Sequence, residues 1–253
     1  TIIVLDGIAL IGMETEHKQR LETLMLDPEA RLAKLAMRDL ALALATQMSG
    51  GTTVSATMLL ANLAGISVFA TGGIGGVHRG WQDSMDISMD IQALASIPVT
   101  VVSAGCKAIL DVGATLEALE SAGVPVWGWQ TAVFPTFYSS TSEFKVELLP
   151  NTETYARAKK LHLELSSNPS GILIANPIPA EFEIRADDIE PTISEAINEA
   201  HQLGISGKAL TPFLLDYLAK LTFGGSVRAN LALLENNVRL AARLAKAEQG
   251  VNG

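Results

Sequence analysis

Short apolar runs rich in β-branched residues alternate along the chain with segments of helical periodicity. The apolar runs are nearly continuous instead of alternating with polar residues, which is typical of strands in a parallel sheet covered on both faces. The helical segments carry apolar residues three and four positions apart. We therefore predict strands at residues 2–5, 67–70, 98–103, 125–129 and 172–176, and helices at residues 28–48, 54–64, 114–121, 154–165, 191–202 and 226–246.

This order of strands and helices favours an α/β protein, a three-layer α/β/α sandwich around a mostly parallel sheet. The chain has no internal repeat and no linker rich in proline or serine, so we expect a single domain over residues 1–253. Residues 40–77 contain no charged residue and no histidine, a length that invites a membrane-spanning interpretation. Glycine and threonine clusters interrupt this run, and we interpret it as buried helices and a buried strand, with no membrane partner.

The amino-acid composition excludes several classes of protein. The chain has 48% hydrophobic residues, only 18% charged residues and a formal charge of −9, which excludes a disordered chain and argues against nucleic-acid binding. The single cysteine, Cys106, excludes an internal disulfide framework and indicates a reducing compartment. No secretory signal is visible, so we expect a cytoplasmic location; organellar targeting stays open because the sequence opens within a predicted strand.

A glycine-rich turn follows the second predicted strand, where ligands of open α/β sheets gather. Residues 71–79 read Thr-Gly-Gly-Ile-Gly-Gly-Val-His-Arg, and such glycines can turn backbone N–H groups toward a ligand. The spacing matches neither common nucleotide-binding motif, so a phosphate site and a merely tight turn both remain open. His78 and Arg79 could add charge there, and Lys34 and Arg38, one turn apart on the predicted helix 28–48, are surface charges or phosphate ligands.

Two further segments carry candidate chemistry. Asp86 and Asp90 would share one face of a helix, where solvent, a lysine or a hydrated divalent cation such as Mg²⁺ or Mn²⁺ would offset their repulsion. Lys107 follows a strand within an apolar window, and desolvation favours the neutral amine that forms Schiff bases, although it could instead extend to water. Cys106 is more simply a buried filler than a reactive thiol. Asn230, Asn236 and Asn237, within an apolar helix, suggest a polar pocket.

Five ordered motifs cover nearly the whole chain and together carry a family resemblance. They are Phe-Ala-Thr-Gly-Gly-Ile-Gly-Gly-Val-His-Arg-Gly at 69–80, Asp-Ile-Ser-x-Asp at 86–90, Ser-Ala-Gly-x-Lys-x-Ile-Leu-Asp at 103–111, Asn-Pro-Ile-Pro at 176–179 and Thr-Pro-Phe-Leu-Leu at 211–215. The chain resembles the pseudouridine-5′-phosphate glycosidases, also known as indigoidine synthase A-like proteins. The resemblance implies a homotrimeric, Mn²⁺-dependent α/β/α enzyme that reversibly splits pseudouridine 5′-phosphate into uracil and ribose 5-phosphate.

The same resemblance assigns roles to individual residues. Lys107 falls on the Schiff-base lysine of the family, and Asp86 falls on the ligand of a Mn²⁺ ion whose other ligands are largely water. The remaining matches are substrate-contacting or further active-site positions: Lys34, Val54, Thr71, His78, Ser88, Met89, Asp90 and Asn230. We expect the glycine turn, Lys34 and His78 to hold phosphate, and Mn²⁺ near Asp86 to order water and the uracil carbonyls.

One departure from the family concerns the proton donor. The family carries an Ala-Leu-Glu-Ser-Thr-like motif near its N-terminus, whose glutamate is the proposed acid, and this sequence has no such motif. We therefore expect the sequence to lack that N-terminal segment and to form the imine while turning over poorly. Two alternatives stay open: another imine-forming sugar-phosphate lyase of the aldolase type, and a weakly active binding subunit.

Overall fold

The computed structural model describes residues 1–205, 207–222 and 224–251. Five parallel strands form the central sheet in the order β10-β9-β11-β7-β5. Four of them confirm predicted strands, whereas β10 was missed because its three residues include an exposed glutamate at the edge of the sheet. The strands are β5 (Val68–Ala70), β7 (Thr100–Ser103), β9 (Val126–Trp129), β10 (Glu147–Leu149) and β11 (Ile172–Ala175).

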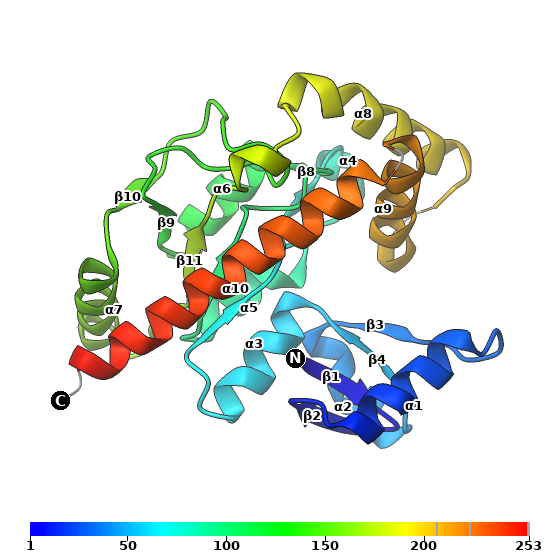
Figure 1. Cartoon of the computed structure of the whole chain (residues 1–253), viewed down its shortest axis with the longest axis horizontal. Coiled ribbons are helices and arrows are strands. Elements are labelled where there is room, and N and C mark those ends of the chain that lie inside the picture. The colour runs from blue at the N-terminus through cyan, green and yellow to red at the C-terminus, as the bar shows by residue number, and fades with distance from the viewer. Residues whose placement is uncertain (206, 223, 252–253) are drawn as a thin grey trace.

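Helices cover both faces of this sheet. Successive strand residues point to opposite sides, so the apolar strands present apolar side chains on both faces, and the helices bury them. Val102 and Ile174 pack with Leu240 of α10 (Gly225–Val251) and with α7 (Thr152–Leu165). Val101 and Leu173 belong to the larger core on the other face, which includes residues of α3 (Val54–Leu63), α5 (Met89–Ser96) and α6 (Val112–Ser121). Figure 1 shows α10 running diagonally across the molecule in front of the sheet. The predicted three-layer α/β/α sandwich is confirmed.

A second sheet lies at the N-terminal end of the chain and contains the first predicted strand. Its order is β2-β1-β4-β3, with β1 (Ile2–Leu5) antiparallel to β2 (Ile8–Ile11) and to β4 (Gly50–Thr52). Asp6 and Gly7 join β1 to β2 with positive φ angles of 47° and 77°, as a tight hairpin turn requires. The expectation that residues 2–5 belong to the parallel sheet is therefore wrong, because this short turn closes a local hairpin first.

The predicted helix over residues 28–48 is also wrong. This stretch contains β3 (Ala33–Leu35), a short 3₁₀ helix (Met37–Asp39) and α2 (Leu40–Ala45). Strand β3 runs parallel to β4, and a Cβ atom on Gly50 would lie only 2.2 Å from the Ala33 carbonyl oxygen. The close pairing of these two backbones overrides the helical propensity of an alanine- and leucine-rich segment.

Helix α3 joins the two sheets by packing in two directions. Ala56 and Leu60 contribute to the small core of the N-terminal sheet, together with Val4 and Leu35. Met58 of the same helix lies in the larger core of the five-stranded sheet. The loops at the carboxyl edge of the parallel sheet are thus held beside strand β3.

The remaining elements are short or peripheral. Helices α8 and α9 lie together beyond the N-terminal end of α10 (Figure 1). Within the described ranges, no helix combines the length and apolar character needed to cross a membrane. The short or peripheral elements are α1 (Thr15–Leu26), β6 (Val77–His78), α4 (Trp81–Ser84), β8 (Leu110–Asp111), α8 (Ala186–Gln202), α9 (Leu210–Leu221) and two 3₁₀ helices (Ala180–Phe182 and Gly207–Ala209).

A buried polar cluster fastens the C-terminal part of α10 to the sheet. The Lys159 amino group lies 2.7 Å from Glu248 and donates to the Ser67 carbonyl oxygen at 2.9 Å. Glu248 also accepts hydrogen bonds from the Tyr155 hydroxyl at 2.5 Å and the Ser67 hydroxyl at 2.6 Å. Burial lowers the pKa of Lys159, and Glu248 opposes that shift. The carboxylate therefore keeps an otherwise unfavourable buried ammonium charged.

Candidate active site

Two loops lie side by side where β5 and β7 end, and one of them carries Lys107. The Ile74 N–H donates to the Gly105 carbonyl at 3.1 Å, and the Lys107 N–H donates to the Ile74 carbonyl at 3.0 Å. Gly105 has a φ of +87°, and a Cβ there would lie 2.1 Å from the Pro135 carbonyl oxygen. Glycine is required at this point because both the conformation and the space exclude a side chain.

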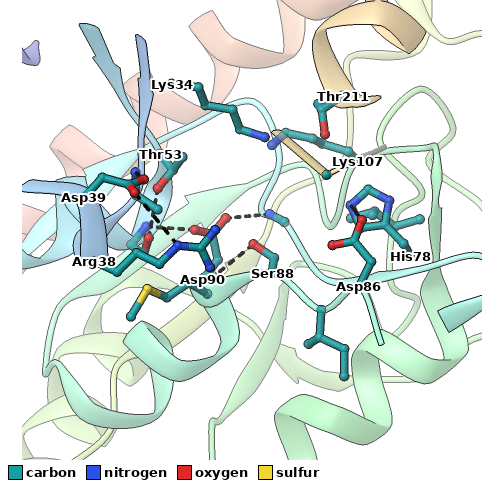
Figure 2. A pocket seen from close by; sticks show the side chains of 17 residues that line it. Lys34, Arg38, Asp39, Thr53, His78, Asp86, Ser88, Asp90, Lys107 and Thr211 are labelled. Carbon is teal, nitrogen blue, oxygen red and sulfur yellow. Dashed lines mark hydrogen bonds and ion pairs between the residues drawn. The ribbon is translucent and has the colours of Figure 1, made fainter. Parts of the chain in front are cut away.

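A small polar cavity of about 130 Å³ opens between this edge and strand β3. Lys34 enters it from β3 and Lys107 from the loop after β7, and Figure 2 shows their amino groups pointing toward one another. Their convergence places two positive charges close together in a lining that also holds Arg38 and the carboxylates of Asp39, Asp86 and Asp90. An anionic group held between the two ammonium groups would offset their mutual repulsion.

His78 and Asp86 face each other on the next side of the cavity (Figure 2). The imidazole Nε2 lies 4.0 Å from Asp86 Oδ2, and the backbone N–H of His78 donates to the backbone carbonyl oxygen of Asp86 at 3.0 Å. Burial lowers the pKa of His78; Asp86 raises it, and the charges of Lys34 and Lys107 lower it further. The imidazole is therefore favoured in its neutral form, so it adds no further positive charge to the cavity.

Asp90 forms the floor of the cavity and is almost fully buried. Its two carboxylate oxygens accept the backbone N–H groups of Ser55 and Gly75, each at 2.8 Å. Asp90 thereby ties the start of α3 to the glycine turn. The sequence-based idea that Asp86 and Asp90 share a helix face is wrong, because α5 begins at Met89, with Ser88 as its N-cap, and Asp86 precedes it.

The glycine turn serves mainly to bring segments close together. A Cβ on Gly75 would lie 2.3 Å from Ser88 Oγ, and one on Gly76 would lie 2.4 Å from Thr115 Oγ1. The N–H groups of Ile74, Gly75 and Val77 already donate to Gly105, Asp90 and Thr115, respectively. These three N–H groups are therefore not available to a phosphate, and the expectation that the turn helps to hold phosphate stays a prediction.

A second and larger cavity, of about 950 Å³, lies on the other side of Lys107. Val54, Thr71 and Asn230 line it, together with apolar side chains from α10. Lys107 lines both cavities. The ten sequence-predicted site residues thus separate into two groups that meet at this lysine. Lys34, His78, Asp86, Ser88, Met89 and Asp90 line the small cavity, and Val54, Thr71 and Asn230 line the large one.

Three neighbouring expectations have different outcomes. Lys34 and Arg38 do not share a helix, since Lys34 lies on β3 and Arg38 on the following 3₁₀ helix, yet both line the small cavity. Cys106 is fully buried, and burial raises the pKa of its thiol to about 12, which confirms the filler interpretation. Asn237 is buried and donates to the Thr71 carbonyl oxygen at 2.8 Å, so core satisfaction explains it better than the pocket we expected.

Sequence reasoning missed several residues of the small cavity. Thr53 and Ser55 lie at the start of α3, and Asp39 and Thr211 also line the cavity. The Gly-Gly-Thr-Thr segment before an apolar helix is an N-cap signal that could have identified Thr53. The starts of α3 and α5 both face this cavity, and helix N-termini favour anions.

The fold and the site together define an α/β/α protein with a lysine-centred ligand cavity at the carboxyl edge of its parallel sheet. Residues 1–247 match the model of the indigoidine synthase A-like proteins. The chain belongs to this family.

Curated relatives and solved structures agree with this assignment. The chain is 50% identical to a pseudouridine-5′-phosphate glycosidase of Roseobacter denitrificans over 98% of this chain and 78% of the relative. It is 48% identical to one of Caldanaerobacter subterraneus subsp. tengcongensis, over 97% of this chain and 78% of the relative. The prealnumycin C-glycosynthase AlnA, solved with ribulose 5-phosphate, superposes with a TM-score of 0.90 at 34% identity, covering 99% and 81% of the two chains. An indigoidine synthase A-like protein of Thermotoga maritima gives 0.87 at 37% identity, covering 96% and 78%.

Proposed function

We propose that this chain cleaves the C–C glycosidic bond of pseudouridine 5′-phosphate, giving uracil and ribose 5-phosphate through an imine on Lys107. The observation that carries the proposal is the position of Lys107 between a small cavity lined by charged and polar side chains, Lys34 among them, and a larger, mostly apolar one. The relatives named as pseudouridine-5′-phosphate glycosidases support the reaction. The ribulose 5-phosphate bound by AlnA supports a phosphorylated sugar as the ligand.

The small cavity supplies the binding groups for the sugar phosphate. Lys34, Arg38 and the starts of α3 and α5 provide positive potential for phosphate. The neutral imidazole of His78 can exchange hydrogen bonds with a sugar hydroxyl. Lys107 then reaches C1′ of the ribose from the junction of the cavities.

The lysine makes an otherwise inert bond cleavable. The Lys107 amine attacks C1′ as the C1′–O4′ bond breaks and O4′ takes up a proton, which leaves C1′ bonded to nitrogen and to C5 of uracil. After C5 is protonated, the nitrogen lone pair forms the C1′=N bond, and the electrons of the C1′–C5 bond restore the C5=C6 bond of uracil. Water adds to the imine, releases ribose 5-phosphate and regenerates the amine.

The small cavity also fits a hydrated divalent cation. In the described part of the chain, no three histidine, cysteine, aspartate or glutamate side chains gather into a metal-binding group. Asp86 offers a partly exposed carboxylate to the cavity, with the Ser88 hydroxyl near the start of α5. One carboxylate with water suits Mn²⁺ or Mg²⁺, which keep several waters. When bound beside Asp86, Mn²⁺ would order water and polarise the uracil carbonyls.

Borohydride trapping tests the imine. Wild-type protein incubated with ribose 5-phosphate and borohydride should gain the mass of the reduced sugar phosphate on the peptide that contains Lys107. Lys107→Ala should gain none and should lose uracil release by at least about 10³-fold. Lys145→Ala, a change in a lysine that lines neither cavity, is the matched control. No adduct on wild type, or the same adduct in Lys107→Ala, would refute the imine.

Substrate and metal are tested separately. Uracil release from pseudouridine 5′-phosphate distinguishes this reaction from that of an aldolase-type lyase, for which trapping would occur without uracil release. Trapping and tight binding without release would identify a binding subunit. Electron paramagnetic resonance should detect Mn²⁺ bound by wild type and lost in Asp86→Asn; equal binding by both would refute the role of Asp86. The expected homotrimer and cytoplasmic location stay predictions.

A further inference from the structure

Arg79 follows His78 directly in the chain but contacts a different part of the molecule. His78 is the last residue of β6 and lines the small cavity, whereas Arg79 begins the turn that follows and does not line that cavity. Arg79 instead lines a separate cavity of about 480 Å³, together with Glu190 of α8. The sequence suggested that both residues supply charge to one site, and Arg79 does not line that site.

The guanidinium of Arg79 holds the turn that begins at Lys107. Its Nη2 donates to the Ala108 carbonyl oxygen at 3.2 Å, and its Nε donates to the Leu110 carbonyl oxygen at 3.4 Å. The Leu110 N–H donates to the Lys107 carbonyl oxygen at 3.0 Å, which closes the turn. A planar guanidinium can hold several acceptors at once, which a lysine ammonium does less well.

Glu190 completes this arrangement from α8. Both terminal nitrogens of Arg79 bond to the Glu190 carboxylate, one of them at 3.0 Å. Arg79 lowers the pKa of Glu190, so the carboxylate remains charged and neutralises the guanidinium. The charges that act on His78 are those of Asp86, Lys34 and Lys107. The contribution of Arg79 to the site is therefore geometric.

We propose that Arg79 is a positioning residue that fixes the Lys107–Leu110 turn, and hence the approach of the Lys107 amine to C1′, with Glu190 keeping the guanidinium in place. The inference rests on the proposed function in taking Lys107 as the nucleophile. The lysine lies on a loop, and small misplacements of a reacting group reduce rates strongly. The Arg79–Glu190 pair connects that loop to α8, whose partner α9 begins beside the small cavity at Thr211.

The test separates positioning from binding. In Arg79→Gln, the rate of borohydride-trapped imine at saturating ribose 5-phosphate should fall roughly 10- to 100-fold. The half-saturating concentration should stay within about twofold, because the phosphate-facing residues are unchanged. Arg79→Lys should recover only part of the rate.

Two further variants keep the proposal falsifiable. Arg239→Gln removes an exposed arginine paired with Glu235 and should trap at the wild-type rate. Glu190→Gln leaves the two carbonyl contacts of Arg79 in place, so it should lower the rate less than Arg79→Gln does. If wild type traps and Arg79→Gln traps equally fast, the inference is overturned while the proposed function stands. If Arg79→Gln does not fold, a wild-type rate in Glu190→Gln overturns it. No adduct on wild type refutes the proposed function instead.

Discussion

Replacing Asp90 with asparagine tests whether this buried carboxylate holds the site together. Both of its oxygens accept backbone N–H groups at 2.8 Å, from Ser55 and from Gly75. Asparagine preserves the shape but turns one acceptor into a donor, so one N–H loses its partner inside the protein. A charged hydrogen bond contributes about 2 kcal/mol, and the surviving bond becomes neutral and weaker by about 1 kcal/mol. The expected loss in the free energy of unfolding is therefore about 3 kcal/mol.

Urea denaturation measures this loss. With a slope near 3 kcal/mol/M, about 3 kcal/mol lowers the urea midpoint by about 1 M at an unchanged slope. Asp83→Asn is the matched control, because Asp83 is exposed on α4 and its replacement should change stability by less than about 0.5 kcal/mol. If Asp90→Asn moves the midpoint no more than the control does, Asp90 does not fasten α3 to the glycine turn.

For three further perturbations, the structure predicts the direction of the change in stability. Burial lowers the pKa of His78 from its ordinary 6.5, so below that pH the unfolded chain binds a proton that the native protein does not. The free energy of unfolding should therefore fall as the pH is lowered through about 6.5. His78→Gln should remove that part of the change in the urea midpoint. Glu248→Gln should cost about 3 kcal/mol in urea denaturation because it strands a buried ammonium, and Lys159→Met should cost less because Glu248 keeps two hydroxyl donors. Gly75→Ala should destabilise by about 1–3 kcal/mol through its clash with Ser88.

Each of these has a control within the chain. His201→Gln changes an exposed histidine and should leave the pH dependence as in wild type. Glu235→Gln breaks an exposed ion pair with Arg239 and should cost less than about 0.5 kcal/mol. Gly51→Ala adds a Cβ that meets nothing within 4 Å, so it should be near neutral. Equal losses in a variant and its control would contradict the structural reason given for that variant.

The parallel sheet could be predicted because its strands are buried on both faces and read as apolar runs. The N-terminal sheet could not, since Ala33–Leu35 becomes a strand only by pairing with Gly50–Thr52, a contact that periodicity does not encode. The hairpin signal at Asp6 and Gly7 was present in the sequence, but its positive φ angles were not inferred.

Most of the site residues were predicted from the family resemblance, and fewer could be predicted from the chemistry of the residues alone. A lysine at the end of a strand was a sound reason to examine Lys107. The division of the site into two cavities depends on how loops from β5 and β7 lie beside each other, which no local pattern reveals. Asp90 looked like a partner of Asp86, whereas its hydrogen bonds bind it to Ser55, 35 positions earlier.

The two lysines of the small cavity come from different parts of the fold, Lys34 from strand β3 of the N-terminal sheet and Lys107 from the loop that follows strand β7 of the parallel sheet. A phosphate contacted by both would connect two sheets that otherwise share helix α3 as their common packing element. Ligand occupancy and the docking of the N-terminal sheet would then be thermodynamically linked. At a ligand concentration 100 times the Kd, that linkage amounts to about 2.7 kcal/mol. The substrate would thus act as a reversible crosslink within the protein. At low substrate concentration, the N-terminal sheet would separate more readily from the rest of the protein.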